Sequence, residues 1–265
     1  MSEVAPDPAS KGTTGLAAMR YRDFQFLLAG KLFAWISLHM IMGAVPFQVY
    51  DVTRDTMNLA YIGLATFAPA IGFSLITGYV ADLFDRRLVV TVCYATIGLA
   101  SFLLLMLTLS GFKEVWPVFL ILAIMGTGRA FDSPAANSLV PNLVPPEIFP
   151  NAIAWHTSSN KITQTVGPAL GGVIYQFWGP EIVYASASIG IVIGAIIVSL
   201  IRTRTERGNR QPTTLRILLA GLRYVYDKKI IFGALTLDLI AVLLGGVTIL
   251  LPVFAIDILD VGAAG

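Results

Sequence analysis

The sequence predicts an all-helical membrane protein, and three observations support this fold class. The composition is 56% hydrophobic and 13% charged, about half the charged fraction of a soluble domain. Uncharged runs that reach or exceed the roughly 20 residues needed to cross a bilayer as a helix recur along the chain. If the amino terminus is cytoplasmic, 13 of the 18 basic residues fall in cytoplasmic segments. Basic residues prefer the cytoplasmic side of a membrane, so this distribution predicts the orientation of the chain.

The predicted spans divide the chain into four segments. Residues 1–23 are a polar cytoplasmic tail, and residues 24–201 hold a bundle of six transmembrane helices. Residues 202–229 are a basic cytoplasmic linker with an amphipathic helix, and residues 230–265 begin with a seventh span. The six bundle spans are predicted at residues 24–50, 58–81, 88–112, 117–141, 150–175 and 182–201.

A short charged segment joins the second and third spans. Gly78 is small enough for a close helix contact, Asp82 lies one turn later, and Asp85, Arg86 and Arg87 place charges of both signs in the turn. Such a cluster can bind a neighbouring helix end and release it, which predicts a gate. The alternative is that the basic pair only fixes the topology.

The fourth span carries a basic and an acidic residue near the bilayer midplane. Arg129 costs at least about 2.5–3.5 kcal/mol there, and Asp132 lies three residues on, on the same helix face. We therefore expect the two side chains to pair. Either the pair is purely structural, or it lines a central cavity where Arg129 meets an anionic substrate or a titrating acid.

Four more ionisable residues lie inside predicted spans. Lys31 is expected to extend to the headgroups, and His39 either carries a proton or makes one hydrogen bond to a neighbouring helix. Lys161 either binds an anionic group or pairs with Asp238 or Asp132. Asp238 is the acid we favour for proton coupling, because no basic residue lies within one helical turn of it. The alternative is that it makes a hydrogen bond in the helix interior.

The fifth span contains a glycine and proline motif. Pro168 removes a backbone hydrogen bond, and Gly167 and Gly171 form a small face for close helix contact, with Gly172 following. This predicts a bend with a tight helix seam. The segment Ala68–Gly72 of the second span repeats the pattern, as transporters built from inverted three-helix units would require.

These motifs together resemble the major facilitator superfamily, and in particular its drug and siderophore exporters related to the enterobactin exporter. The matching positions are Gly78, Asp82, Arg86 and Arg87 in the loop, the segment Arg129–Ala135, and the antiporter-like motif Gly167, Pro168, Gly171 and Gly172. Leu83 replaces a usual basic residue of the loop, and Ser158 stands where fuller antiporter motifs have glycine. The resemblance implies a six-helix bundle of two inverted repeats, export by proton antiport, and no cofactor beyond the proton-motive force.

Other functions find less support in the sequence. It has no phosphate-binding Gly-x-x-x-x-Gly-Lys motif, no His-Glu-x-x-His and no nucleophile elbow, so neither an enzyme nor an ATP-driven pump is expected. The single Cys93 excludes a disulfide within the chain and predicts a small buried hydrophobe. We expect a small-molecule substrate and the lipid bilayer as partners, with no nucleic acid and no bound metal.

Two alternatives stay open at this stage. A non-transporting membrane scaffold with the same fold would explain the spans, although it has no need for buried charges at Arg129, Lys161 and Asp238. The family resemblance also implies a second six-helix bundle, of which this sequence has only the first helix. We therefore expect either a fragment that lacks the carboxyl-terminal half or a homodimer.

Overall fold

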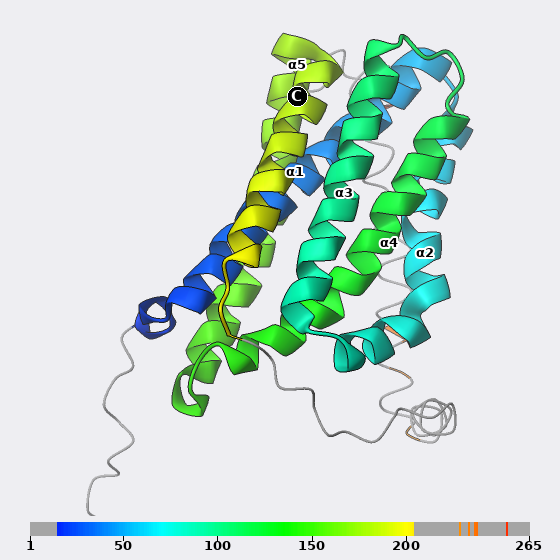
Figure 1. Cartoon of the computed structure of the whole chain (residues 1–265). Helices are drawn as coiled ribbons and strands as arrows, with labels where there is room; N and C mark the ends of the chain where they lie inside the picture. Colours follow the sequence, from blue (N-terminus) through cyan, green and yellow to red (C-terminus); the bar gives the residue numbers. More distant parts are fainter. Residues whose placement is uncertain (1–14, 204–227, 229–232, 234–235, 238–252, 254–265) are drawn as a thin grey trace, which may run out of the picture.

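The computed structural model describes residues 15–203, together with residues 228, 233, 236–237 and 253. Within this part of the chain all regular elements are helices (Figure 1). In chain order they are η2 (Ala17–Arg20), α1 (Arg22–Thr53), α2 (Thr56–Leu83), α3 (Arg86–Leu109), α4 (Trp116–Leu139), η3 (Val140–Asn142), η4 (Pro146–Ile148) and α5 (Phe149–Ser199).

Five of these helices are long and apolar enough to cross a membrane. The predicted all-helical membrane class is therefore confirmed for the described residues. The predicted linker and seventh span, with Asp238, lie almost entirely outside them.

The longest helix, α5, contains a reversal of the chain. Gly179 has φ 82° and ψ 172°, a left-handed conformation that glycine adopts without steric cost. Pro180 follows, where the missing amide hydrogen does not interrupt a continuing helix. Helix α5 therefore consists of two arms, residues 149–178 and 180–199, that join at one end of the bundle (Figure 1).

Contacts with α1 show that these arms run in opposite directions. As residue numbers increase along the first arm, the residue numbers of the contacted positions on α1 also increase. Along the second arm they decrease. The pairs are Lys31–His156 and Asp51–Tyr175 for the first arm, and Gln48–Tyr184 and Gly30–Gly194 for the second. Helix α1 is therefore held by both arms.

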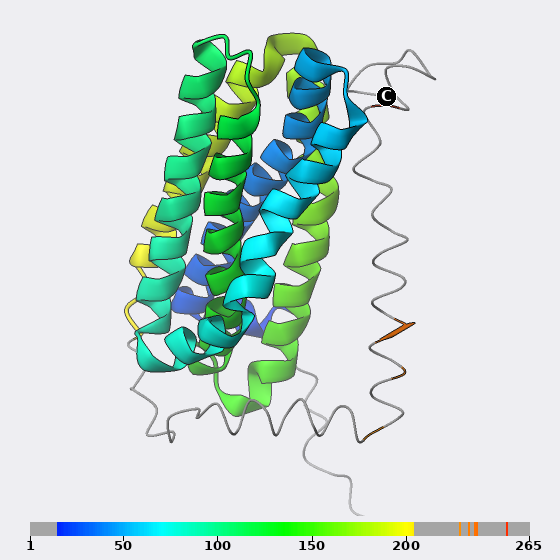
Figure 2. The same cartoon turned by 90° about the vertical axis from the view of Figure 1, so that its right-hand side faces the viewer.

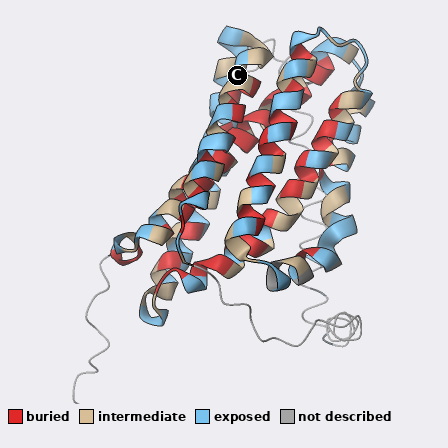
Figure 3. Cartoon of the chain, viewed as in Figure 1, coloured by how far each residue is buried: buried red, intermediate tan, exposed pale blue. Residues whose placement is uncertain are grey.

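The remaining helices complete the bundle. Helix α4 packs against α2 and α3, and α3 also packs against α5 (Figure 2). Buried residues follow the faces that the helices turn toward one another, and exposed apolar residues cover the outside (Figure 3). An apolar exterior is what a protein surrounded by lipid requires.

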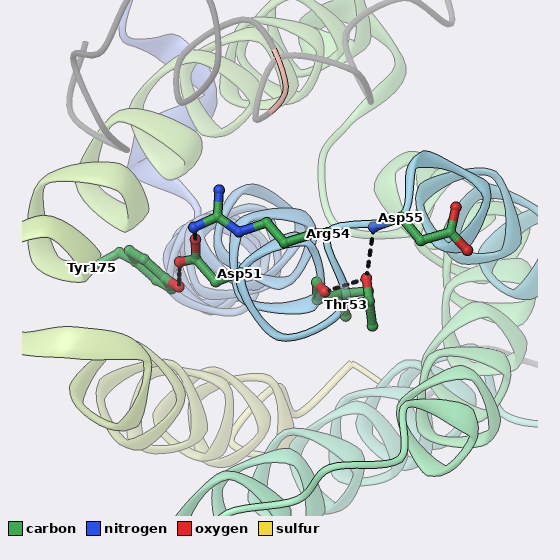
Figure 4. A network of polar contacts seen from close by, with 6 residues as sticks. Asp51, Thr53, Arg54, Asp55 and Tyr175 are labelled. Atoms are coloured by element: carbon green, nitrogen blue, oxygen red, sulfur yellow. Dashed lines mark hydrogen bonds and ion pairs between the residues drawn. The ribbon is translucent and has the colours of Figure 1, made fainter.

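The turn between α1 and α2 is shorter than predicted, because α1 continues to Thr53 and leaves two residues in the turn. Arg54 adopts the left-handed conformation with φ 51°, and the amide of Asp55 donates to the Thr53 hydroxyl at 3.3 Å. Asp51 accepts a 3.0 Å bond from the Tyr175 hydroxyl and pairs with Arg54 at 3.7 Å (Figure 4). This network fastens the turn to the first arm of α5.

The predicted seam at the glycine motif is present between α5 and α1. A Cβ on Gly171 would lie 2.6 Å from the Met40 carbonyl oxygen, and one on Gly167 would meet the His39 Cβ. Gly43 lies against Pro168, with 3.3 Å between its ideal Cβ and the proline Cα. The two backbones touch here, so small residues are required on both helices.

A Gly171→Ala variant is expected to be destabilised by about 1–3 kcal/mol, since its methyl group meets backbone that cannot move aside. The matched control is Gly72→Ala, because nothing described lies within 4 Å of a Cβ there. Thermal unfolding in detergent should give a lower midpoint for Gly171→Ala alone. Equal midpoints for the two variants would show that the seam is not tight.

Candidate functional site

The turn between α2 and α3 is shorter than the predicted charged loop. Helix α2 runs through Leu83, so Asp82 belongs to the helix, and only Phe84 and Asp85 lie between the helices. The Asp85 carboxylate caps α3 by accepting from the amide of Arg87 at 3.0 Å. The side chain of Asp82 lies outside the described residues.

The two arginines of the motif bind the ends of other helices. Arg86 donates to the Ser138 carbonyl in the last turn of α4 at 2.8 Å, and Arg87 donates to the Ile201 carbonyl just beyond α5. Carbonyl groups at helix carboxyl ends lack intrahelical partners and favour nearby cations. The arginines therefore join α3 to the ends of α4 and α5, as the prediction of a helix-end clamp requires.

Gly78 makes no close helix contact with the part of the chain that the structure describes. Nothing described lies within 4 Å of a Cβ at this position, and the residue is exposed. A contact between Gly78 and the rest of the chain lies outside the described residues, so the close approach stays a prediction.

A cluster of polar side chains lies inside the bundle, and its first member is Lys31 on α1. The side chain is 3% exposed, and its Nζ atom lies 2.8 Å from Nε2 of His156 and 3.2 Å from the His156 carbonyl oxygen. Lys31 is therefore bound within the protein, and the expectation that it extends to the headgroups is wrong. The first arm of α5 supplies the partner that the lysine needs when it is buried.

Trp35 is the centre of the second part of the cluster. Its indole N–H donates to Oδ2 of Asp132 at 3.0 Å, and the Arg129 guanidinium lies 5.9 Å from its ring centre. The ring of His39 meets the Trp35 ring edge-on at 5.6 Å. Arg129 and Asp132 are thus brought together as predicted, but each contacts Trp35, and no ion pair joins them within the described residues.

Three buried polar atoms of the cluster have no hydrogen-bond partner among the described residues. They are Nδ1 of His39, the hydroxyl of Tyr94 and Oδ1 of Asp132. Buried polar groups in folded proteins are nearly always paired. An interior that leaves three of them open can accept hydrogen bonds or protons from a bound molecule.

Lys161 is placed differently from the cluster. Its side chain is exposed, whereas Asp132 is 1% exposed, so the predicted alternative of a Lys161–Asp132 pair is wrong. The two lie on different helices, and α5 turns Lys161 away from the interior. A pair with Asp238 lies outside the described residues.

An apolar cavity of about 270 Å³ lies between α2, α3 and α4. Phe84, Val92, Cys93, Gly128 and Phe131 are among the residues that line it. It has the apolar lining typical of small-molecule pockets. Within the described residues no cluster of histidine, cysteine and acidic side chains is arranged to hold a metal ion.

The role of Trp35 and the bond between Lys31 and His156 were not predicted from the sequence. One signal was available, since Lys31, Trp35 and His39 are spaced by four residues and so share one face of α1. A helix face that carries a lysine, a tryptophan and a histidine at membrane depth predicts polar partners on the facing helices.

Comparison of the sequence with known proteins assigns the chain to a family. The family model described as transmembrane secretion effector, within the major facilitator superfamily, matches residues 13–265. The chain belongs to this family. Its members are multi-pass membrane transporters, so the protein is an efflux-type transporter homologue and not an enzyme.

Individual proteins that are similar in sequence support this family assignment. Macrolide efflux protein A of Streptococcus pyogenes is 27% identical over 80% of this chain and 53% of the relative. The protein of the same name from Enterococcus faecalis is 28% identical over 67% of this chain and 54% of the relative. The enterobactin exporter EntS of Citrobacter koseri is 23% identical over 88% of this chain and 56% of the relative. The chain thus spans about half the length of these relatives.

Proposed function

We propose that this protein is a secondary active exporter of a small amphipathic molecule of drug or siderophore type, working by proton antiport and alternating access. The observation that carries the proposal is the ionisable cluster of Lys31, Arg129 and Asp132 inside an apolar bundle. Charges at membrane depth are costly and mark transport pathways. Relatives named for macrolide efflux and enterobactin export support outward transport.

The proposed architecture is a six-helix bundle of two inverted three-helix repeats. Two proline contacts support it, because Pro69 on α2 lies against Gly126 on α4, and Pro168 on α5 lies against Gly43 on α1. The ideal Cβ of each glycine lies 3.3 Å from an atom of the proline. Inverted repeats would make these two contacts equivalent.

The proposed location is the inner membrane, with the amino terminus in the cytoplasm. The start of α1 and the chain beyond α5 meet at one end of the bundle, where Asp23 accepts bonds from the amides of Arg202 and Thr203 at 3.1 and 2.8 Å. Arg86 and Arg87 lie at the same end, since they bind the ends of α4 and α5. A basic end of this kind prefers the cytoplasm.

The clamp formed by Arg86 and Arg87 is the proposed gate. It joins three helices through hydrogen bonds at their ends, so its opening would release α3 from α4 and α5 together. Asp82, one turn before the clamp, is proposed to bias its equilibrium. The antiporter-like motif has a different role, as the close α1–α5 seam.

The cavity residues of this proposal are those of the cluster, namely Arg129, Asp132 and His39, with Lys161 and Asp238 as further candidates. The driving force is the proton gradient, and no cofactor is required. The rival is a membrane scaffold with the same fold. It is disfavoured because the polar atoms of His39 and Asp132 that lack partners among the described residues serve no purpose in a static bundle.

Inverted membrane vesicles with an imposed pH gradient test this function directly. We expect the vesicles to accumulate an amphipathic dye such as ethidium, or another member of a substrate panel, only while the gradient lasts. In the same assay Asp82→Asn should slow uptake and leave the half-saturating concentration unchanged. Absence of gradient-dependent uptake across the panel would contradict export by this chain, and equal loss of binding and rate in Asp82→Asn would contradict the gate.

A further inference from the structure

Asp132 is the one carboxylate of the described cluster, and its two oxygens differ. Oδ2 accepts the 3.0 Å bond from the Trp35 indole, whereas Oδ1 is buried and has no hydrogen-bond partner among the described residues. The residue is 1% exposed. One lone-pair site of a membrane-embedded carboxyl group is therefore open.

The charged and titratable groups around Asp132 come from three helices. Lys31 approaches from α1, Cys93 and Tyr94 from α3, and Arg129 from α4 itself. His39 on α1 contacts Trp35, whose indole binds Asp132. Both cations are near enough to interact electrostatically with the carboxyl group. The first arm of α5 adds a histidine that contacts Lys31 and not Asp132.

Neither cation makes an ion pair with this carboxyl group. Lys31 is bonded to the histidine of α5, and Arg129 lies over the ring of Trp35. An ionised carboxylate is costly in an apolar interior unless it is paired, and binding a proton removes that cost. Two cations that lie nearby without forming an ion pair with Asp132 lower the cost of its ionised form. Both the protonated and the ionised state of Asp132 are therefore accessible.

We infer that Oδ1 of Asp132 is the proton-binding atom of the antiporter, a role that the sequence analysis gave to Asp238. This inference depends on the export function proposed above. A hydronium ion from the outer side gives its proton to Oδ1, which forms the O–H bond and leaves water. On the cytoplasmic side the O–H bond breaks, and the proton returns to water.

Protonation of Asp132 reaches the helix packing through Trp35. The indole N–H bond to an ionised carboxylate is charge-assisted, and such bonds are roughly twice as strong as neutral ones. Neutralising Asp132 therefore weakens one bond between α1 and α4 and removes the negative charge near Lys31 and Arg129. The protonated and ionised states of Asp132 thus differ in how strongly α1 is bound to α4.

Infrared difference spectroscopy of the purified protein in detergent tests the assignment without any substrate. We expect a carboxylic acid C=O band that decreases as the pH is raised, is missing from Asp132→Asn and shifts in Asp132→Glu. The exposed Glu147→Gln is the matched control and should leave the band unchanged. A band that persists unshifted in both Asp132 variants would overturn the inference.

Transport then separates this inference from the proposed function. In vesicles that accumulate ethidium with the wild-type protein, Asp132→Asn should lose gradient-driven accumulation. If Asp132→Asn accumulates ethidium like the wild type, the inference is wrong and the export function stands. If the wild type does not accumulate it, the export function loses support, and the infrared band alone decides on Asp132.

Discussion

A His156→Leu variant is expected to lose about 3 kcal/mol of folding free energy. The Nζ atom of Lys31 lies 2.8 Å from Nε2 of His156, and the lysine is 3% exposed. Removing the imidazole leaves an ammonium group inside the bundle whose remaining hydrogen-bond partner among the described residues is the carbonyl oxygen at 3.2 Å. An unsatisfied buried polar group costs about 1–3 kcal/mol and a charged one costs more. Thermal unfolding in detergent measures the loss.

A double-mutant cycle provides the control for this result. Lys31→Met removes the charge as well as the bond, so Lys31→Met combined with His156→Leu should be more stable than His156→Leu alone. His39→Leu is the matched histidine control, because its Nδ1 atom already lacks a partner within the described residues. Strictly additive losses in the cycle would show that Lys31 and His156 are not coupled.

The helices of this fold could be predicted from the sequence because each apolar run specifies its own span. The structure places α1, α3 and α4 within a few residues of the predicted ranges. The differences are at the ends, where caps and turns decide. Asp85 caps α3 and allows it to begin at Arg86, and α1 continues beyond Tyr50 to Thr53. Such end effects depend on single hydrogen bonds that hydropathy does not register.

The site could be predicted from the sequence only in part, for a different reason. Spacing shows that Arg129 and Asp132 share a face of one helix, but not which helix faces them. Asp132 and Trp35 are separated by 97 positions, and Lys31 and His156 by 125. Such contacts depend on how α1 is rotated between its neighbours, and the glycine contacts at the α1–α5 seam set that rotation. The expected Arg129–Asp132 pair was therefore wrong in its detail although both residues lie in the cluster.

An Arg129→Ala variant is expected to reduce transport by more than about tenfold, close to the level of vesicles without the protein. Arg129 is one of two cations near the buried Asp132 carboxyl group, and its guanidinium lies 5.9 Å from the centre of the Trp35 ring. Without this nearby positive charge the ionised form of Asp132 costs more in the apolar interior, and a cost of about 1.4 kcal/mol already corresponds to a tenfold effect. The loss should appear in gradient-driven uptake of ethidium.

Two further variants show whether charge or shape matters at this position. Arg129→Lys keeps the charge but loses the planar group that contacts Trp35, so partial activity is expected. Lys113→Ala is the matched control, since Lys113 is exposed and lies in the turn between α3 and α4. It should retain far more uptake than Arg129→Ala.

The position of the side chain can be checked independently. A cysteine at position 129 should react with a water-soluble maleimide when the transporter opens its cavity, after Cys93 has been replaced by alanine. Protein amounts in the membrane must match between variants, because a misfolded Arg129→Ala protein would also lose uptake. A cysteine at 129 that reacts only with lipid-soluble reagents would place the residue against the bilayer. In that case Arg129 stabilises the outer face of the bundle, and its proposed role next to Asp132 is wrong.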